Sequence, residues 1–272
     1  DGNVLVQMKN NEYKPIQEII IGDKLAYNNH VKSIYKFSSA DANMYMLNDE
    51  IVDGYHTVLY GSNYIFVNEH PEATLIEYNK EYIYCLDTTY HRIITENNIY
   101  LDYVGIRTKH NIYINDYLET LNQKGIKKDI EYFDTIGRSY LEKMIMLNNN
   151  TLIRMEDGEI KRLLDISIGE KVAEGGLVFG KMISTDCVSM TKHNNDIIGT
   201  KHLIIDGRPN KCWEDDDNCV KDTILMNIGS YIFTKNNKLV SGSGCIIENP
   251  ILDYNNDERD IEFEREIQTV YT

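Results

Sequence analysis

The 272-residue chain lacks many of the features that most directly reveal a protein's class. It has only four prolines and one tryptophan, and no apolar run approaches the ~20 residues of a membrane-spanning helix. We find no signal peptide, phosphate-binding loop, dinucleotide-binding glycine motif, GxSxG elbow or paired zinc motif. These absences argue against a membrane protein and an ordinary metabolic enzyme, and we expect no cofactor and no metal. Because residue 1 is Asp, we expect a fragment or a processed form.

Positive charge is also scarce. The chain has 28 Lys and Arg against 43 Asp and Glu, a net charge of −15 and a pI near 4.9. Nonspecific binding to nucleic acid or to an anionic membrane needs a basic surface. The composition therefore predicts neither partner, and other protein subunits are the partners that we expect.

Cysteine is present but forms no recognisable framework. Five scattered cysteines, an odd number, favour a reducing interior over a disulfide scaffold. Cys212 and Cys219 flank four consecutive acids and could hold a metal or a loop disulfide, but their spacing matches no zinc pattern. We interpret this segment as an exposed acidic loop, and Cys85 and Cys245 as small buried apolar residues.

Tyrosine, by contrast, is abundant, with 20 residues. Tyr, Ile and Val favour strands, and short runs rich in these residues alternate with Asn, Gly and Asp. The pattern predicts an all-β sandwich or barrel in the first hundred residues. The expected strands are 4–8, 31–37, 44–47, 58–60, 64–67, 74–78, 82–86, 92–95 and 99–102.

The opening of the chain recurs 147 positions later. Residues 4–25 align without a gap to residues 151–172, and eight of the 22 positions are identical. A period of this length exceeds that of solenoid repeats and matches a duplicated domain. We expect unit 1 at 1–105 and unit 2 at 147–254. Between them, i, i+4 apolar spacing predicts a short helical linker at 106–146, and a charged tail follows at 255–272.

The repeated opening carries a family resemblance. Its Ile-x-x-Ile-x-x-Gly-Asp-x-Leu pattern, at 16–25, resembles the first block of the Hint superfamily, the self-processing domains of hedgehog proteins and inteins. Residues 53–58 look like the His-containing second block. Residues 68–73 and 84–103 resemble segments of Hint-like proteins from large DNA viruses, phages and bacteria. In unit 2, residues 199–204 echo the His block and 251–254 echo the closing Leu-Asp-Tyr.

The resemblance implies an intramolecular reaction. In the family, an N-terminal Cys or Ser attacks the preceding carbonyl, and the His of the second block protonates the departing nitrogen. His56 is the candidate acid of unit 1, with Asp53 in place of the usual Thr or Ser, and His202 is its unit 2 counterpart. The nucleophile position of unit 2 is Met146, whose thioether cannot attack. The nucleophile of unit 1 would lie two residues upstream of Asp1.

Two functions remain open on this basis. The first is a structural or interaction protein of degenerate Hint-like domains, a virion or particle component located in the virion or the host cytoplasm. The alternative is an autoprocessing domain in which unit 1 cleaves itself by an N–S acyl shift. His91 also fits the Thr-x-x-His pattern, but it comes late in unit 1, and we interpret it as structural.

Overall fold

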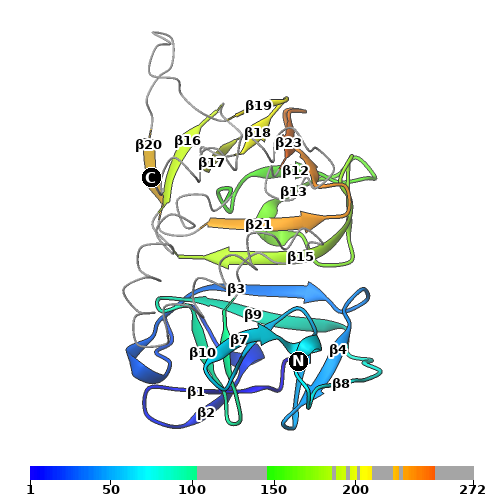
Figure 1. Cartoon of the computed structure of the whole chain (residues 1–272). Coiled ribbons are helices and arrows are strands. Elements are labelled where there is room, and N and C mark those ends of the chain that lie inside the picture. The colour runs from blue at the N-terminus through cyan, green and yellow to red at the C-terminus, as the bar shows by residue number, and fades with distance from the viewer. Residues whose placement is uncertain are drawn as a thin grey trace, which may run out of the picture.

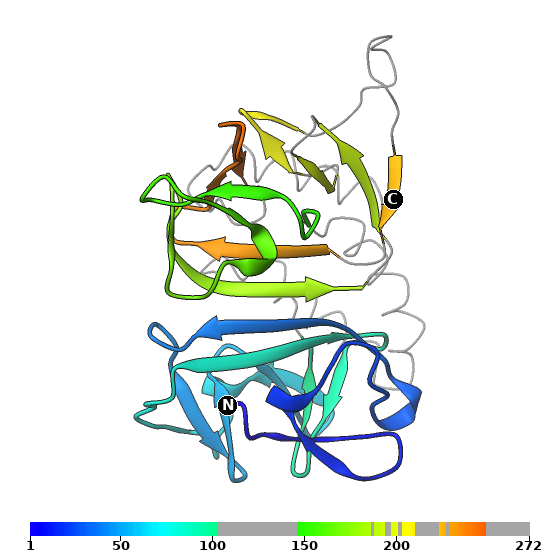
Figure 2. The same ribbon diagram turned by 180° about the vertical axis from the view of Figure 1, so that it is seen from behind.

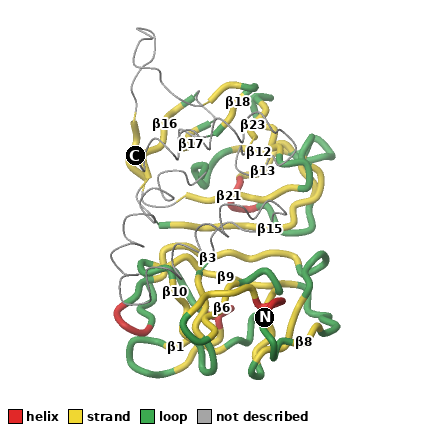
Figure 3. Tube along the Cα trace, in the orientation of Figure 1, coloured by secondary structure: helices red, strands yellow, loops and turns green. Residues whose placement is uncertain are grey.

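The computed structural model describes residues 1–102, 146–185, 188–193, 197–200, 203–209, 223–226 and 229–248. Within these ranges the chain is mainly β, with single turns of 3-10 helix (Figure 3). This confirms the predicted fold class at its coarse level. No helix in the described part is long and apolar enough to cross a membrane. The predicted linker (apart from Met146), the charged tail, His202 and the Cys212–Cys219 loop lie outside the described residues.

The N-terminal half, residues 1–102, contains eleven short strands. All nine expected strands are present, and β2 and β5 are additional. The elements are β1 (Leu5–Gln7), β2 (Tyr13–Pro15), η1 (Ile16–Glu18), η2 (Ala26–Asn28), β3 (Val31–Ser38), β4 (Met44–Leu47), β5 (Glu50–Asp53), β6 (Thr57–Tyr60), β7 (Asn63–Phe66), η3 (Val67–Glu69), β8 (Thr74–Leu75), β9 (Tyr82–Thr88), β10 (Arg92–Ile94) and β11 (Ile99–Leu101).

The C-terminal half, the described residues from 146 to 248, follows a similar order. Its elements are β12 (Leu152–Arg154), β13 (Ile160–Arg162), η5 (Leu163–Asp165), β14 (Lys171–Val172), β15 (Gly176–Ser184), β16 (Val188–Lys192), β17 (Ile198–Thr200), β18 (Ile204–Ile205), β19 (Arg208–Pro209), β20 (Thr223–Met226), β21 (Gly229–Thr234), β22 (Lys238–Val240) and β23 (Ile246–Glu248).

The repeated opening folds into the same local structure in both halves. The hairpins β1–β2 and β12–β13 pair in the same register, each followed by one 3-10 turn. Lys14 Nζ lies 2.8 Å from Asp23 Oδ2, and Lys161 Nζ lies 2.7 Å from Glu170 Oε1 at the equivalent positions. These pairs are partly exposed and contribute little to stability, but they show that the sequence repeat is also a structural repeat.

One antiparallel pair of strands joins the two halves. β3 of the N-terminal half pairs with β15 of the C-terminal half, with β9 beside β3 and β21 beside β15 (Figures 1 and 2). At the centre of the β3–β15 ladder, Tyr35 lies opposite Met182, its own counterpart 147 residues on. The same shift of 147 residues converts each of the other pairs into another pair of the ladder: Ser33–Ser184, for example, corresponds to Gly180–Phe37. The two strands are therefore related by a pseudo-two-fold axis through the Tyr35–Met182 pair.

Side chains of β3 point alternately to its two faces, and those at every second position from Val31 to Phe37 are buried in the core. The ring of Phe37 packs against Phe233 of the other half, with ring centroids 5.2 Å apart. Gly180 faces this ring so closely that a Cβ there would lie 2.2 Å from Phe37 Cδ1. A glycine is therefore required where the two halves meet.

Candidate functional site

The N-terminal half contains a cavity of about 90 Å³ that gathers polar and titratable side chains from distant parts of the sequence. Asp53 comes from the end of β5, His56 from the turn before β6, Cys85 from β9, and Tyr100 and Asp102 from the end of the β11 segment. His56 and Asp53, the two site residues predicted from the sequence, both line this cavity. Cys85 and Asp102 are additional.

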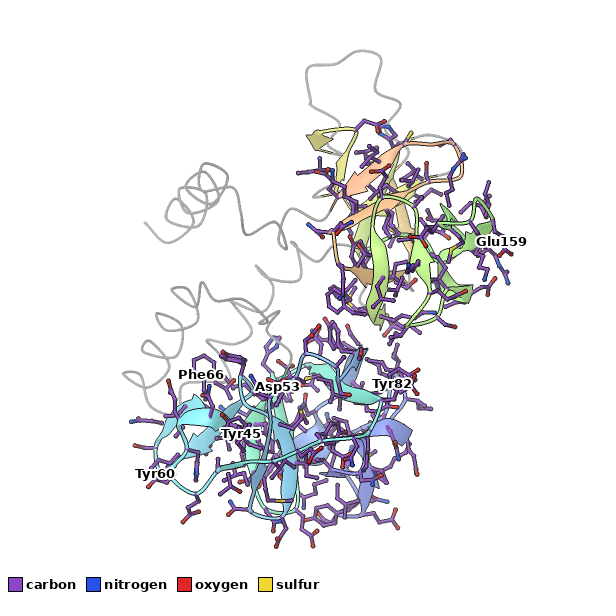
Figure 4. The ribbon with its side chains drawn as sticks, turned by 90° about the vertical axis from the view of Figure 1, so that its right-hand side faces the viewer. Tyr45, Asp53, Tyr60, Phe66, Tyr82 and Glu159 are labelled. Atoms are coloured by element: carbon purple, nitrogen blue, oxygen red, sulfur yellow. The ribbon has the colours of Figure 1, made fainter. Side chains whose placement is uncertain are left out.

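The turn that carries His56 is fixed by Asp53. Asp53 Oδ1 accepts a hydrogen bond of 2.9 Å from the backbone N–H of Tyr55, and the N–H of His56 donates to Asp53 O at 3.0 Å. A short carboxylate that binds the backbone two residues on is a common turn-forming device. Gly54 fits inside this turn beneath the ring of Tyr45, and Figure 4 shows Tyr45 and Asp53 in the same half of the molecule.

His56 presents a neutral imidazole to the cavity. Its ring lies 5.5 Å from the ring of Tyr100, centroid to centroid. Burial lowers the pKa of His56 to about 4, although the charges of Asp53 and Asp102 act in the opposite direction. Near neutral pH this side chain is therefore an unprotonated, weakly basic imidazole that lacks the second ring proton of an imidazolium acid.

Cys85 is a poor nucleophile in this environment. The side chain is buried, and burial, followed by the nearby charge of Asp102, raises the pKa of the thiol well above its usual range. The thiol donates a weak hydrogen bond to Leu86 O at 3.6 Å. Because the thiolate is the reactive form, Cys85 is expected to be inert, in agreement with the predicted buried role.

A buried carboxylate, that of Glu50, binds the hydroxyl of Tyr100, one of the residues that line the cavity. Glu50 Oε2 accepts hydrogen bonds from the hydroxyl of Tyr100 at 2.8 Å and from Asn98 Nδ2 at 2.7 Å. The N–H of Asn97 donates to Glu50 Oε1 at 3.3 Å. Burial is the largest of the effects that raise the pKa of Tyr100, with the charge of Glu50 next. This network orients Tyr100, whose ring packs against His56.

The C-terminal half repeats the backbone of this site. The N–H of Asn148 donates to Ile198 O at 2.8 Å, as the nitrogen of Asp1 does to Ile51 O at the same distance. The N–H of Leu203 donates to Thr200 O at 3.2 Å, as His56 does to Asp53. Leu203 therefore occupies the position of His56. The residue predicted there from sequence, His202, lies outside the described part of the chain.

The side chains at the equivalent positions are mostly apolar. Tyr231 pairs with Met182 as Cys85 pairs with Tyr35, and Ile247 pairs with Ile205 on the strand equivalent to β11. Met146, the predicted nucleophile position, is fully buried, and its N–H donates to Thr200 Oγ1 at 3.2 Å. The cavity residues Asp53, His56, Cys85 and Tyr100 of the N-terminal half thus correspond to Thr200, Leu203, Tyr231 and Ile247.

One signal could have revealed more of the site. Asp102 directly follows the apolar run Ile99–Leu101, so its carboxylate stands at the end of a buried strand, and it lines the cavity. Glu50 and Cys85 carry no comparable signal, because their placement depends on pairing between distant strands.

Comparisons with known proteins add no identification: no protein-family model, no curated protein and no solved structure matches the chain.

Proposed function

We propose that this chain is a structural or interaction module of two fused Hint-like units, joined by a helical linker at 106–146, that serves as a component of a larger protein assembly such as a virion or particle. The proposal combines the resemblance of the repeated opening to the Hint superfamily with the condition of the two sites. Its acidic surface, with a net charge of −15, favours protein partners over nucleic acid.

The observation that carries the proposal is the change of residue types at the equivalent positions of the C-terminal half. Leu203 takes the position of the acid, and Met146 takes the position of the nucleophile. Neither a thioether nor an isobutyl group can transfer a proton or attack a carbonyl. Their complete burial instead adds to the core, at ~2–3 kcal/mol for each such side chain. In this half the site positions contribute packing.

The junction between the halves also suits a structural role. β3 and β15 form five consecutive residue pairs, from Ser33–Ser184 to Phe37–Gly180. Aromatic rings from both halves, those of Phe37, Phe179 and Phe233, pack together beside the ladder. Main-chain hydrogen bonds and buried rings together favour one rigid unit over two loosely tethered domains.

The polar cavity of the N-terminal half favours a second candidate, self-processing by unit 1. A neutral imidazole at His56 could take the proton of a nucleophile and pass it to the departing nitrogen. The nucleophile would be a residue two positions upstream of Asp1 in a longer product.

Intact mass of the full-length gene product under denaturing conditions, with and without dithiothreitol, distinguishes the two candidates. A structural module gives one species at the full translated mass in both samples. Self-processing gives thiol-enhanced cleavage near Asp1, and the same product carrying His56→Leu should then remain whole. Cleavage in the parent that is lost in this variant would replace the structural proposal with the second candidate.

The assembly part of the proposal needs a separate measurement. Sedimentation of the native protein from its source should place it in particles far larger than the 31.6 kDa of this chain. A protein that sediments only as a monomer would contradict a structural role.

A further inference from the structure

A second cluster of titratable side chains lies where β9 turns into β10. His91 Nδ1 lies 3.2 Å from Asp102 Oδ1 and 3.7 Å from Asp87 Oδ1. These three side chains form the one group in the described residues that brings at least three metal-ligating atoms within 4.8 Å of one another. The two carboxylates are almost completely buried, whereas 17% of the His91 side chain is exposed, so the cluster is reached from the histidine side.

In each carboxylate, Oδ1 lies near His91 and Oδ2 accepts a hydrogen bond from a hydroxyl group, which orients the side chain. Asp102 Oδ2 accepts hydrogen bonds from the N–H of Thr88 at 2.7 Å and from Thr88 Oγ1 at 3.0 Å. Asp87 Oδ2 accepts a longer bond of 3.4 Å from Ser33 Oγ. Both Oδ1 atoms therefore point to the same side as His91 Nδ1. Outer hydrogen bonds of this kind orient the ligands in metal sites.

The spacing of the three atoms suits a small divalent ion. Zinc–nitrogen and zinc–oxygen bonds of about 2.0–2.2 Å in a tetrahedral arrangement place neighbouring ligand atoms roughly 3.3–3.5 Å apart. The distances of 3.2 and 3.7 Å from His91 Nδ1 lie on either side of that range. Calcium would need longer bonds and six to eight oxygen ligands, and magnesium would need octahedral oxygen ligands. One imidazole with two carboxylates favours zinc among these ions.

The C-terminal half offers an internal comparison. Asn237 takes the place of His91 in the turn between β21 and β22, and Phe233 takes the place of Asp87 on β21. The backbone is the same, since φ is 52° at His91 and 55° at Asn237. Asn adopts this left-handed conformation readily, whereas His does so less often. The N-terminal half thus carries a histidine in a turn that folds equally well around asparagine.

We propose that Asp87, His91 and Asp102 bind one zinc ion, with a water molecule as the fourth ligand. The ion joins the end of β9, the β9–β10 turn and the end of β11. This site shares Asp102 with the cavity that holds His56, and it does not depend on the proposed structural role.

The test is zinc binding to the metal-stripped 272-residue chain, measured by native mass spectrometry and titration calorimetry with Zn²⁺ alone. His91→Asn is the central variant, because Asn237 shows that the turn accepts this residue. We expect one zinc per wild-type chain and an affinity roughly a hundredfold or more lower in His91→Asn. The exposed His193 provides the matched control, since His193→Asn should bind zinc as the wild type does.

The cysteines are a competing source of zinc binding, and Co²⁺ distinguishes them. Cobalt bound at the proposed site gives visible d–d absorption without the thiolate charge-transfer band that cysteine ligands produce. Absence of stoichiometric zinc, equal affinity in His91→Asn, or a thiolate band lost on cysteine alkylation would each overturn the proposal. If His91→Asn fails to fold, Asp87→Asn takes its place, with the same expected loss.

Discussion

The pH dependence of folding stability should reveal the lowered pKa of His56. In the folded chain, burial lowers its pKa from the ordinary value of 6.5 to about 4. In the unfolded chain the histidine takes up its proton near pH 6.5. Between these two pH values the unfolded state binds more protons than the folded state. The stability that this group contributes is therefore complete above pH 6.5 and is lost as the pH falls towards 4.

The size of the effect follows from the same relation. Between pH 7 and pH 5, a histidine with these two pKa values removes about 2 kcal/mol from the free energy of unfolding. The comparison variant is His56→Leu, because Leu203 shows that the equivalent turn accepts leucine. Urea unfolding at both pH values gives the stability difference between wild type and variant. We expect that difference to shift by about 2 kcal/mol against the wild type at pH 5.

A second histidine controls for general acid effects. His193→Gln, which replaces an exposed histidine outside the cavity, is the matched control substitution. Equal pH slopes for the wild type and His56→Leu would show that the imidazole is solvated. That result would refute the conclusion that burial lowers the pKa of His56.

Three further changes test the packing. Gly180→Ala places a Cβ 2.2 Å from Phe37 Cδ1, and we expect a loss of about 1–3 kcal/mol in urea unfolding with an unchanged m value. Met146→Ala removes a fully buried side chain and should cost about 2–5 kcal/mol in the same assay. Tyr100→Phe removes one of the donors to the buried carboxylate of Glu50 and should cost about 1–3 kcal/mol.

Each of these changes has an outcome that would contradict it. Leu152 is 40% exposed, so Leu152→Ala should cost far less than Met146→Ala, and equal losses would mean that Met146 is not part of the core. An unchanged urea midpoint for Gly180→Ala would show that the ring of Phe37 does not pack against the backbone at Gly180. If Tyr100→Phe were as stable as the wild type, water would have to replace the lost hydrogen bond to Glu50, and this carboxylate would not be buried.

Most strands of the N-terminal half could be predicted, because apolar and aromatic runs alternate with turn residues. β2 and β5 were missed for opposite reasons. β2 is the short polar segment Tyr13–Pro15, which carries no apolar pattern. β5 follows Asn48 and Asp49, which both adopt positive φ. Two such residues between strand-like runs are a hairpin signal, so β5 could have been found.

The junction between the halves could not be predicted from sequence. The gapless repeat ends at residues 25 and 172, before β3 and β15, and nothing local in either strand specifies that the two pair with each other. The site shows the same limit. His56 and Asp53 lie three residues apart, and a motif found them. Cys85 and Asp102 reach the same cavity only through the pairing of β9 and β11 with other strands.

The contrast between the halves makes the stability of His56→Leu at pH 7 informative. A desolvated polar group costs free energy unless it is paired, and no hydrogen bond from the His56 imidazole is present among the described residues. A structural module has no need of such a group. If leucine at this position leaves the protein as stable or less stable, the packing of the His56 ring offsets this cost, which is the result that a purely structural role requires. If leucine instead stabilises the chain, the imidazole is retained against folding stability, and the self-processing candidate is favoured.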